Sequence, residues 1–238
     1  DYLQAPANST AIIPLHGSML KYGTYCSYGT TEIADMIDMA VESPKISGLI
    51  LDIDSGGGSV DAIAPLVCSI QNARKKQKCV IAYADLCASA AYYVACYCNE
   101  IIASNNISSE FGSIGVMMSF MDYEKYYESN GVKQHTIYSD LSNYKNEPFE
   151  LARKGEYEKI RSEELNPLAR KFQEAVKHQR GDKLNQSIEG ILAGRMFYAE
   201  TAQENGLIDN MGNMDYAIQR VNEIRRDAVV NEYINSKF

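Results

Sequence analysis

Residues 46–59 read ISGLILDIDSGGGS. The first part, 46–53, is an apolar run typical of a strand that is buried on both faces of a parallel sheet. The second part, 54–59, is a turn rich in glycine, and the apolar spacing beyond it predicts a helix over about 60–75. A strand, a short turn and a helix in this order form the repeating unit of α/β proteins.

The same unit recurs on both sides of this stretch. Strands are predicted at 11–16, 79–83 and 100–103, and helices at about 31–41 and 88–98. Units of this length imply parallel strands joined by right-handed crossovers. The fold class predicted here is α/β, with stacked parallel strand–helix units and a long C-terminal helix.

Beyond residue 115 the pattern becomes mostly helical. It predicts one further strand, a tyrosine-rich helix near 122–129, a strand at 134–138 and a long charged helix over about 151–178, bent at Pro167. Helices at 199–205 and 214–225 complete the chain. No repeat or linker divides the sequence, so we predict a single domain over 1–238, with tails before about residue 10 and after about residue 225.

The composition excludes several classes of protein. The 238 residues are 45% hydrophobic and carry a net charge of −8, and this acidic balance argues against nucleic acid as the main partner, because phosphate binding needs a basic surface. No run approaches the roughly 18 apolar residues of a membrane span. We expect a soluble, cytoplasmic chain, although a leader or anchor removed from the N-terminus would leave no trace here.

The six cysteines indicate buried thiols rather than a metal site. They are Cys26, Cys68, Cys79, Cys87, Cys96 and Cys98. Three lie within or beside apolar segments, where free cysteine behaves as a small hydrophobic residue. The Cys96–Cys98 pair lacks the two-residue spacing of zinc sites and has no histidine nearby. We expect reduced thiols, no metal and no cofactor.

Ser89 is distinguished from the other serines by its neighbours. It opens a predicted helix directly after a strand, and Ala88, Ala90 and Ala91 leave its hydroxyl unshielded. The alternative is that Ser89 only caps the helix, a common role for serine. A hydroxyl nucleophile also needs a base, and none of the three histidines has a characteristic catalytic context. A lysine can serve instead if burial lowers its pKa enough to leave a neutral amine.

Five short segments follow one another along the chain: 13–17 (IPLHG), 51–58 (LDIDSGGG), 88–93 (ASAAYY), 111–116 (FGSIGV) and 194–197 (GRMF). Together with a closing segment at 199–209 they resemble the ordered motifs of the S49 peptidases. That family includes signal peptide peptidase A and phage capsid-assembly proteases. The resemblance covers about residues 10–225, and although each motif is weak alone, five in this order are specific.

The resemblance implies a Clp protease/crotonase-like fold and a Ser/Lys dyad. Matched by motif, Ser89 is the nucleophile, and the backbone N–H groups of Gly57 and Ala90 form the oxyanion hole. Two such donors lower the barrier by about 3–4 kcal/mol each. The chain departs from the family at Ala90-Ala91, where Gly-Gly is usual, and at Gly56, where proline is common. Alanine keeps its N–H, so the implied hole survives the first change.

The lysine of the dyad is less directly matched. An ungapped match from Ser139 to Pro148 places Asn143 at the lysine position, and asparagine cannot act as a base. Lys145 lies two residues later, a shift that a loop absorbs easily, so it is the expected base. Lys125 and Lys133 are poorer candidates, because one is predicted in a helix and the other at an exposed strand start.

Three functions remain open at this point. The first is a serine endopeptidase that cleaves extended peptide segments, such as signal-peptide remnants or phage scaffold protein. The second is a catalytically inactive, ring-forming assembly protein of the same fold. The third is an acyl-CoA enzyme of the crotonase type, which would need an acid such as Asp54 or Asp85 near the hole. The family forms rings or domes, so the resemblance also implies a homo-oligomer.

Overall fold

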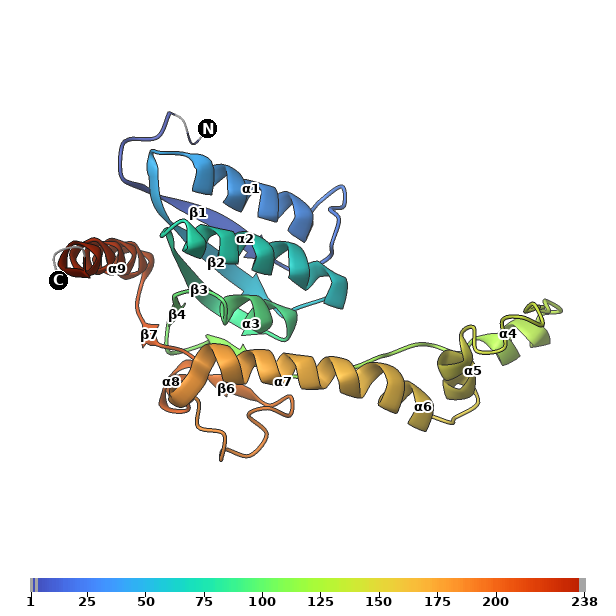
Figure 1. The fold of residues 1–238 in the computed structure, drawn as a ribbon. Coiled ribbons are helices and arrows are strands. Elements are labelled where there is room, and N and C mark those ends of the chain that lie inside the picture. The colour runs from blue at the N-terminus through green and yellow to red at the C-terminus, as the bar shows by residue number, and fades with distance from the viewer. Residues whose placement is uncertain (1, 3, 236–238) are drawn as a thin grey trace. The chain divides into compact units, whose positions relative to one another are not determined.

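The computed structural model describes residues 2 and 4–235. The chain forms two compact units, which are described separately: the sheet unit (residues 1–115 and 173–238) and the helical unit (residues 116–172). Both units are labelled by their elements in Figure 1.

The sheet unit is built on strands in the order β1-β2-β3-β4-β7, and all pairings along this path are parallel. These strands are β1 (Ser9–His16), β2 (Ile46–Ser55), β3 (Cys79–Ala88), β4 (Glu100–Ala103) and β7 (Asn210–Met211). The four strands predicted in this half are therefore confirmed. Strand β7 has only two residues, too few to leave a pattern in the sequence.

The stretch from Leu49 to Leu51 in β2 is apolar and fully buried because helices cover both faces of the sheet. Figure 1 shows α1 (Thr30–Glu42), α2 (Ile63–Lys75) and α3 (Ala90–Ala95) along one face and α9 (Met214–Asn235) on the other. Ile50 packs with Ile81 and with Val221 of α9 in one buried cluster. Each such side chain that is fully buried stabilises the fold by about 1.5–3 kcal/mol.

A short strand lies beside the end of β3, and a second short strand lies beside the first. Strand β5 (Glu110–Gly112) pairs in parallel with the last three residues of β3, and β6 (Met196–Tyr198) pairs antiparallel with β5. Helix α8 (Ala199–Glu204) follows β6. The segment around residue 112 thus lies beside the strand that leads to Ser89, and the segment around residue 196, far away in the sequence, lies on the other side of β5.

The long helix predicted over about 151–178 is interrupted. Helix α5 (Glu147–Arg153) ends before Gly155, whose φ of +87° is incompatible with a helix. The helical chain resumes as α6 (Glu158–Ile160), a π-helical turn η2 (Arg161–Leu165) and α7 (Asn166–Arg180). The sequence predicts a bend at Pro167. What the structure shows is a wider, π-helical turn directly before this proline, which relieves the clash between a proline ring and the preceding carbonyl groups.

The helical unit contains α4 (Glu124–Ser129), α5, α6 and η2, with the start of α7. The two strands predicted between residues 116 and 138 are wrong, because these residues form no ladder within the described chain. The helical unit has few buried side chains, which are those of Ala152, Ile160 and Phe172.

Two 3-10 turns and the C-terminal helix complete the chain. The 3-10 turn η1 (Val60–Ala62) precedes α2, and η3 (Gly181–Lys183) follows α7. Helix α9 continues to Asn235, so most of the tail predicted after residue 225 is helical. Residues 1, 3 and 236–238 of the predicted tails lie outside the described chain. Over residues 2 and 4–235, every helix falls short of the length or the apolar character needed to cross a bilayer.

Candidate active site

The motif segments meet at the carboxyl ends of β1, β2 and β3 through backbone hydrogen bonds. The Gly17 N–H donates to Asp54 O (2.8 Å), and the Met19 N–H donates to Gly57 O (2.9 Å). On the other side, the Ser89 N–H donates to Gly112 O (2.9 Å). Ligands of parallel sheets bind at this edge, so the fold places the motifs where a site is expected.

Ser89 occupies the N-cap position of α3 but does not act as a cap. Its hydroxyl makes no capping hydrogen bond, and Ser89 Oγ has no other hydrogen-bond partner within the described chain. The backbone at Ser89 has φ +52° and ψ −124°, a conformation that costs a non-glycine residue about 1–3 kcal/mol. The capping interpretation is therefore not supported, and a half-buried hydroxyl is presented on a strained turn.

The glycine turn after β2 packs directly against Ser89. Gly57 has φ +97°, and a methyl group there would lie 2.8 Å from Ser89 Cβ and 2.8 Å from Ala90 N. The Ala90 N–H begins the helix and has no acceptor among residues 2 and 4–235. The Gly57 N–H, by contrast, donates to Ser55 Oγ (3.1 Å).

Sequence reasoning missed the role of Ser55. This residue is 1% exposed, and its hydroxyl donates to Gly17 O (2.6 Å) while accepting from the Gly57 N–H. It therefore ties the turn after β1 to the glycine turn. Next to this bond, the Gly58 N–H is without an acceptor in the part of the chain that the structure describes. A buried polar residue at the end of an apolar strand was the signal that could have drawn attention to Ser55.

Lys145 lies in the helical unit, on the turn that precedes α5. Its backbone N–H donates to Ser142 O (3.0 Å), and Asn146 follows in the left-handed conformation (φ +62°). The side chain is exposed, and its ammonium group has no hydrogen bond or ion pair to any residue that the structure describes. The two poorer candidates, Lys125 in α4 and Lys133 outside any strand, are exposed as well.

Two other groups are unsuited to act as the base. Lys159 bonds to Glu147, and this hydrogen bond raises the pKa of Lys159, which opposes the neutral form. His16 lies at the end of β1, where its Nε2 is 3.1 Å from Asp52 Oδ2. Ser89 is not among its partners.

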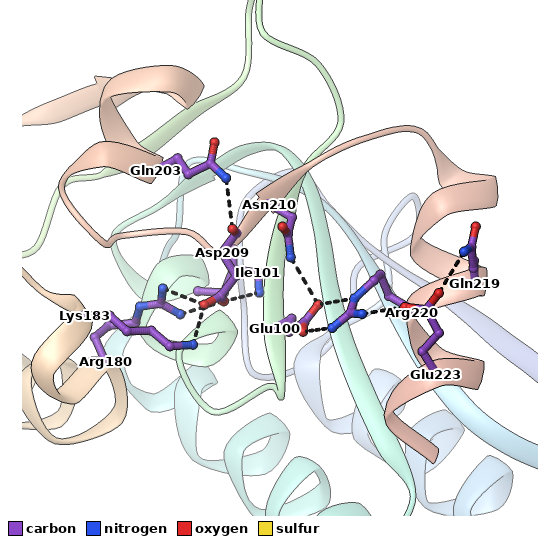
Figure 2. Close-up of polar contacts among 10 residues, drawn as sticks. All are labelled: Glu100, Ile101, Arg180, Lys183, Gln203, Asp209, Asn210, Gln219, Arg220 and Glu223. Atoms are coloured by element: carbon purple, nitrogen blue, oxygen red, sulfur yellow. Dashed lines mark hydrogen bonds and ion pairs between the residues drawn. The ribbon is translucent and has the colours of Figure 1, made fainter. Parts of the chain in front are cut away.

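A buried ion pair supports the helix that follows Ser89. Tyr92 is fully buried, and its hydroxyl donates to Leu207 O (2.7 Å). The neighbouring loop is fixed by Arg180, whose Nε donates to Gly206 O (2.8 Å) and whose Nη1 donates to Asp209 Oδ2 (2.8 Å). Figure 2 shows that the Asp209 carboxylate also accepts hydrogen bonds from Lys183 Nζ and from the Ile101 N–H. The bond from Ile101 ties the loop to β4.

The charges in this network set the ionisation of Asp209. Burial by itself would raise the pKa of this carboxyl, but the hydrogen bond and charge of Arg180, with Lys183 and the Ile101 N–H, hold the pKa below its usual range. A second cluster in Figure 2 joins Arg220 of α9 to Glu100 of β4 and to Glu223. The hydrogen bond with Glu100 raises the pKa of Arg220 further, so its guanidinium group is charged at neutral pH.

Four of the six cysteines are buried and all six are free thiols: Cys79, Cys87, Cys96 and Cys98 are buried, and Cys26 and Cys68 are exposed. Burial raises the pKa of Cys79 and of Cys96 to about 12, which keeps these thiols protonated. They pack as apolar side chains, as the sequence predicted.

Comparison with known proteins agrees with the geometry. The sequence profile of peptidase family S49 matches residues 72–228. The chain is 28% identical to the chloroplastic serine protease SPPA of Arabidopsis thaliana over 217 residues, covering 87% of this chain and 31% of that protein. It is 27% identical to the head-tail preconnector protein GP5 of Enterobacteria phage P21 over 216 residues, covering 89% of this chain and 42% of that protein. The chain spans less than two thirds of the length of the curated relatives it matches.

A solved structure confirms the fold. A point mutant of 1510-N, a membrane-bound stomatin-specific protease, superposes with a TM-score of 0.51 at 16% identity, covering 90% of this chain and 84% of that one. The expectation of a Clp protease/crotonase-like α/β fold is thereby confirmed. A profile match over more than half of the chain, on a fold that brings the motif segments together around Ser89, leads to one conclusion: the chain belongs to peptidase family S49.

Proposed function

We propose that this protein is a serine endopeptidase in which Ser89 is the nucleophile and Lys145 the general base. The observation that carries the proposal is the state of Ser89. Its hydroxyl is half-buried, lacks a hydrogen-bond partner among the described residues, and sits on a strained backbone beside the glycine turn. Strain of this kind persists at functional sites because the surrounding structure holds it.

The reaction proceeds through an acyl-enzyme. The neutral Lys145 amine takes the proton of the Ser89 hydroxyl as the oxygen attacks the peptide carbonyl carbon. The tetrahedral intermediate then collapses, the C–N bond breaks, and the lysine returns its proton to the leaving amine. Water activated by the same amine hydrolyses the ester and restores both residues.

The oxyanion is held by backbone N–H groups on the two sides of Ser89. Ala90 supplies one donor, because its N–H begins α3 without an acceptor among the described residues. The motif assigns the second donor to Gly57, whose N–H now bonds to Ser55 Oγ. An oxyanion is a stronger acceptor than a hydroxyl, so this N–H can be shared with substrate. The Gly58 N–H in the same turn is the alternative donor.

The proposed base needs a drier environment than the helical unit by itself gives it. A lysine loses its proton near neutral pH only when burial disfavours the charged form, and Lys145 is exposed in the helical unit. We assign the missing cover to a second copy of the chain in a ring- or dome-shaped homo-oligomer. The phage relative is named a head-tail preconnector protein, and this name supports a role in assembly.

The proposed substrates are extended peptides or unfolded protein segments in the cytoplasm. Signal-peptide remnants and phage scaffold protein are the two candidate sources. One relative is named a putative signal peptide peptidase, which supports the first source, and another is named a phage head-tail preconnector protein, which supports the second. Digestion of a peptide library with the wild type distinguishes the two sources. The peptides that are cleaved disappear from the library, and their sequences show which source the enzyme prefers.

Labelling with a serine-directed fluorophosphonate tests the dyad. The wild type should be labelled at Ser89, whereas Ser89→Ala should not react. Ser113→Ala is the matched control, since Ser113 has the same φ of +52°, and it should be labelled like the wild type. Lys145→Ala should lower the labelling rate by about 10²–10⁴-fold, while Lys133→Ala should not.

Equal labelling of Ser89→Ala and the wild type would remove Ser89 from the mechanism. A wild type that assembles but shows neither labelling nor cleavage would support the inactive assembly protein instead. Hydrolysis of an acyl-CoA would point to the crotonase-type reaction.

A further inference from the structure

The edge of β3 carries two different strands in succession. Ala84 pairs with Ala103, the last residue of β4, and Leu86 pairs with Glu110, the first residue of β5. Residue 85 lies between these pairs, and the chain between β4 and β5 loops out over residues 104–109. Asp85 therefore stands at the break where one strand leaves β3 and the next one joins it.

The carboxylate of Asp85 binds this loop from both ends. Its Oδ1 accepts hydrogen bonds from Ser109 Oγ (2.9 Å), Asn105 Nδ2 (3.0 Å), Ser108 Oγ (3.1 Å) and Ser104 Oγ (3.5 Å). Hydrogen bonds to an ionised carboxylate are about twice as strong as neutral ones. Burial would raise the pKa of Asp85, but the four donors together hold it below its usual range, so the group is ionised at neutral pH.

The loop is ordered around these bonds. The Ile107 and Ser108 N–H groups donate to Asn105 Oδ1 (2.8 and 2.7 Å), and the Asn105 N–H donates to Ser109 Oγ (3.2 Å). Ser109 is fully buried, and its carbonyl accepts from the Ala199 N–H (2.9 Å). Ser109, which makes the shortest hydrogen bond to Asp85, thus also directly precedes β5.

Strand β5 is short, and the nucleophile depends on it. Only three of its residues pair with β3, and Gly112 at its end accepts the Ser89 N–H (2.9 Å). A shift of β5 along β3 would break this bond and release the strained turn at Ser89. Displacement of a reacting group by about 1 Å costs about 10²-fold in rate.

We propose that Asp85 is a positioning residue for Ser89: by binding the 104–109 loop it fixes the register of β5 and thereby the orientation of the nucleophile. The effect on catalysis rests on the proposed function of Ser89. The anchoring of β5 does not, since it concerns backbone geometry alone.

The experiment compares Asp85→Ala with a matched control, Asp38→Ala. Asp38 also accepts from a serine and an asparagine, Ser69 Oγ (3.0 Å) and Asn72 Nδ2 (3.4 Å), but it joins α1 to α2 away from β5. Fluorophosphonate labelling of Ser89 is measured against probe concentration, which separates the rate constant at saturation from the half-saturating concentration. Hydrogen exchange is followed in the peptide that contains the Ser89 amide.

Asp85→Ala should lower the labelling rate constant at saturation by about 10–100-fold, with the half-saturating concentration within about twofold of wild type, and should speed exchange of the Ser89 amide. Asp38→Ala should lower Tm by about as much as Asp85→Ala does. It should leave both the labelling rate constant and the exchange of the Ser89 amide at their wild-type values. Asp85→Asn keeps one acceptor oxygen and should recover part of the rate. If Asp85→Ala does not fold, Ser109→Ala removes the shortest bond and should produce the same changes in smaller measure.

An Asp85→Ala protein that folds and retains the wild-type labelling rate and Ser89 amide exchange would overturn the proposal. If the wild type itself is not labelled at Ser89, the proposed function fails, and amide exchange alone decides. Faster exchange in Asp85→Ala than in Asp38→Ala then supports the anchoring, and equal exchange refutes it.

Discussion

At the scale of single residues, the site depends on backbone conformations that side chains normally avoid. Ser89 has φ +52°, and its Cβ makes this conformation costly. Ser89→Gly removes the Cβ, whereas Ser89→Ala keeps it. The glycine variant should therefore have a free energy of unfolding about 1 kcal/mol higher than the alanine variant, measured by urea denaturation. Ala95→Gly in the helical part of α3 is the control and should lose stability; a Ser89→Gly protein less stable than Ser89→Ala would contradict the strain.

Gly57 is constrained by both conformation and space. A methyl group there would meet Ser89 Cβ and Ala90 N at 2.8 Å, and neither backbone nor Cβ can move aside freely. Gly57→Ala should cost about 1–3 kcal/mol of stability and at least tenfold in fluorophosphonate labelling of Ser89. Gly155→Ala provides the comparison, because Gly155 has a similar φ (+87°) with open space around it. Gly155→Ala should lose some stability but should be labelled at Ser89 like the wild type. If both variants lost labelling equally, the contact between residue 57 and Ser89 would not be the cause.

The sequence was sufficient to single out Ser89 but not its environment. Small neighbours and a position after a strand are visible in one dimension, whereas the positive φ depends on the bond from the Ser89 N–H to Gly112 O, 23 residues away in sequence. Ser55 was missed for the same reason, since its partner Gly17 comes from a different strand end. The role of Lys145 stays a prediction, because its environment depends on more than its own loop.

At the scale of elements, the strands and helices of residues 9–103 were predictable, whereas the strands of two or three residues beyond them were not. Strand β2 and helix α1 carry many residues with one spacing, and both were predicted within two residues at each end. Strands β5, β6 and β7 have three, three and two residues, too few for any periodicity. Their strand geometry comes from pairing with other strands, β5 with β3, β6 with β5 and β7 with β4, so only the tertiary structure defines them.

The buried pair between α7 and the loop before β7 gives a pH-dependent prediction. Asp209 has a lowered pKa in the folded protein, so its contribution to stability is complete above the unfolded value near 4 and is lost as the pH falls through the folded value. Asp209→Asn leaves Arg180 without its charge partner and should cost about 3 kcal/mol at pH 7. Urea denaturation should show a smaller difference between variant and wild type below about pH 4.

The control for this pair is the exposed one between Lys76 and Glu42. Glu42→Gln should leave the denaturation midpoint unchanged at either pH, because exposed pairs contribute little. A loss in Asp209→Asn that is the same at pH 7 and at pH 3 would show that the Asp209 charge is not what stabilises the loop.

At the scale of the whole molecule, the helical unit leaves much of its apolar surface uncovered. Ile137 is 92% exposed and Leu141 is 96% exposed, and several tyrosines and methionines of the same unit are exposed as well. Apolar side chains that a folded unit leaves exposed in such number indicate an interaction site. The same unit carries the proposed base, whose amine needs cover from water. One event, the docking of a second copy, would meet both requirements.

This connection between assembly and catalysis can be tested with Leu141→Asp. A charge at a docked apolar position disfavours association, so the variant should sediment as a smaller species and lose labelling of Ser89 in parallel, while the sheet unit keeps its Tm. Met39→Asp, on α1 of the sheet unit, changes an exposed apolar residue (64%) in the same way and should affect neither. Raising the protein concentration should restore labelling in Leu141→Asp as the larger species returns. Full labelling by a dissociated Leu141→Asp protein would mean that one chain suffices to shelter the base.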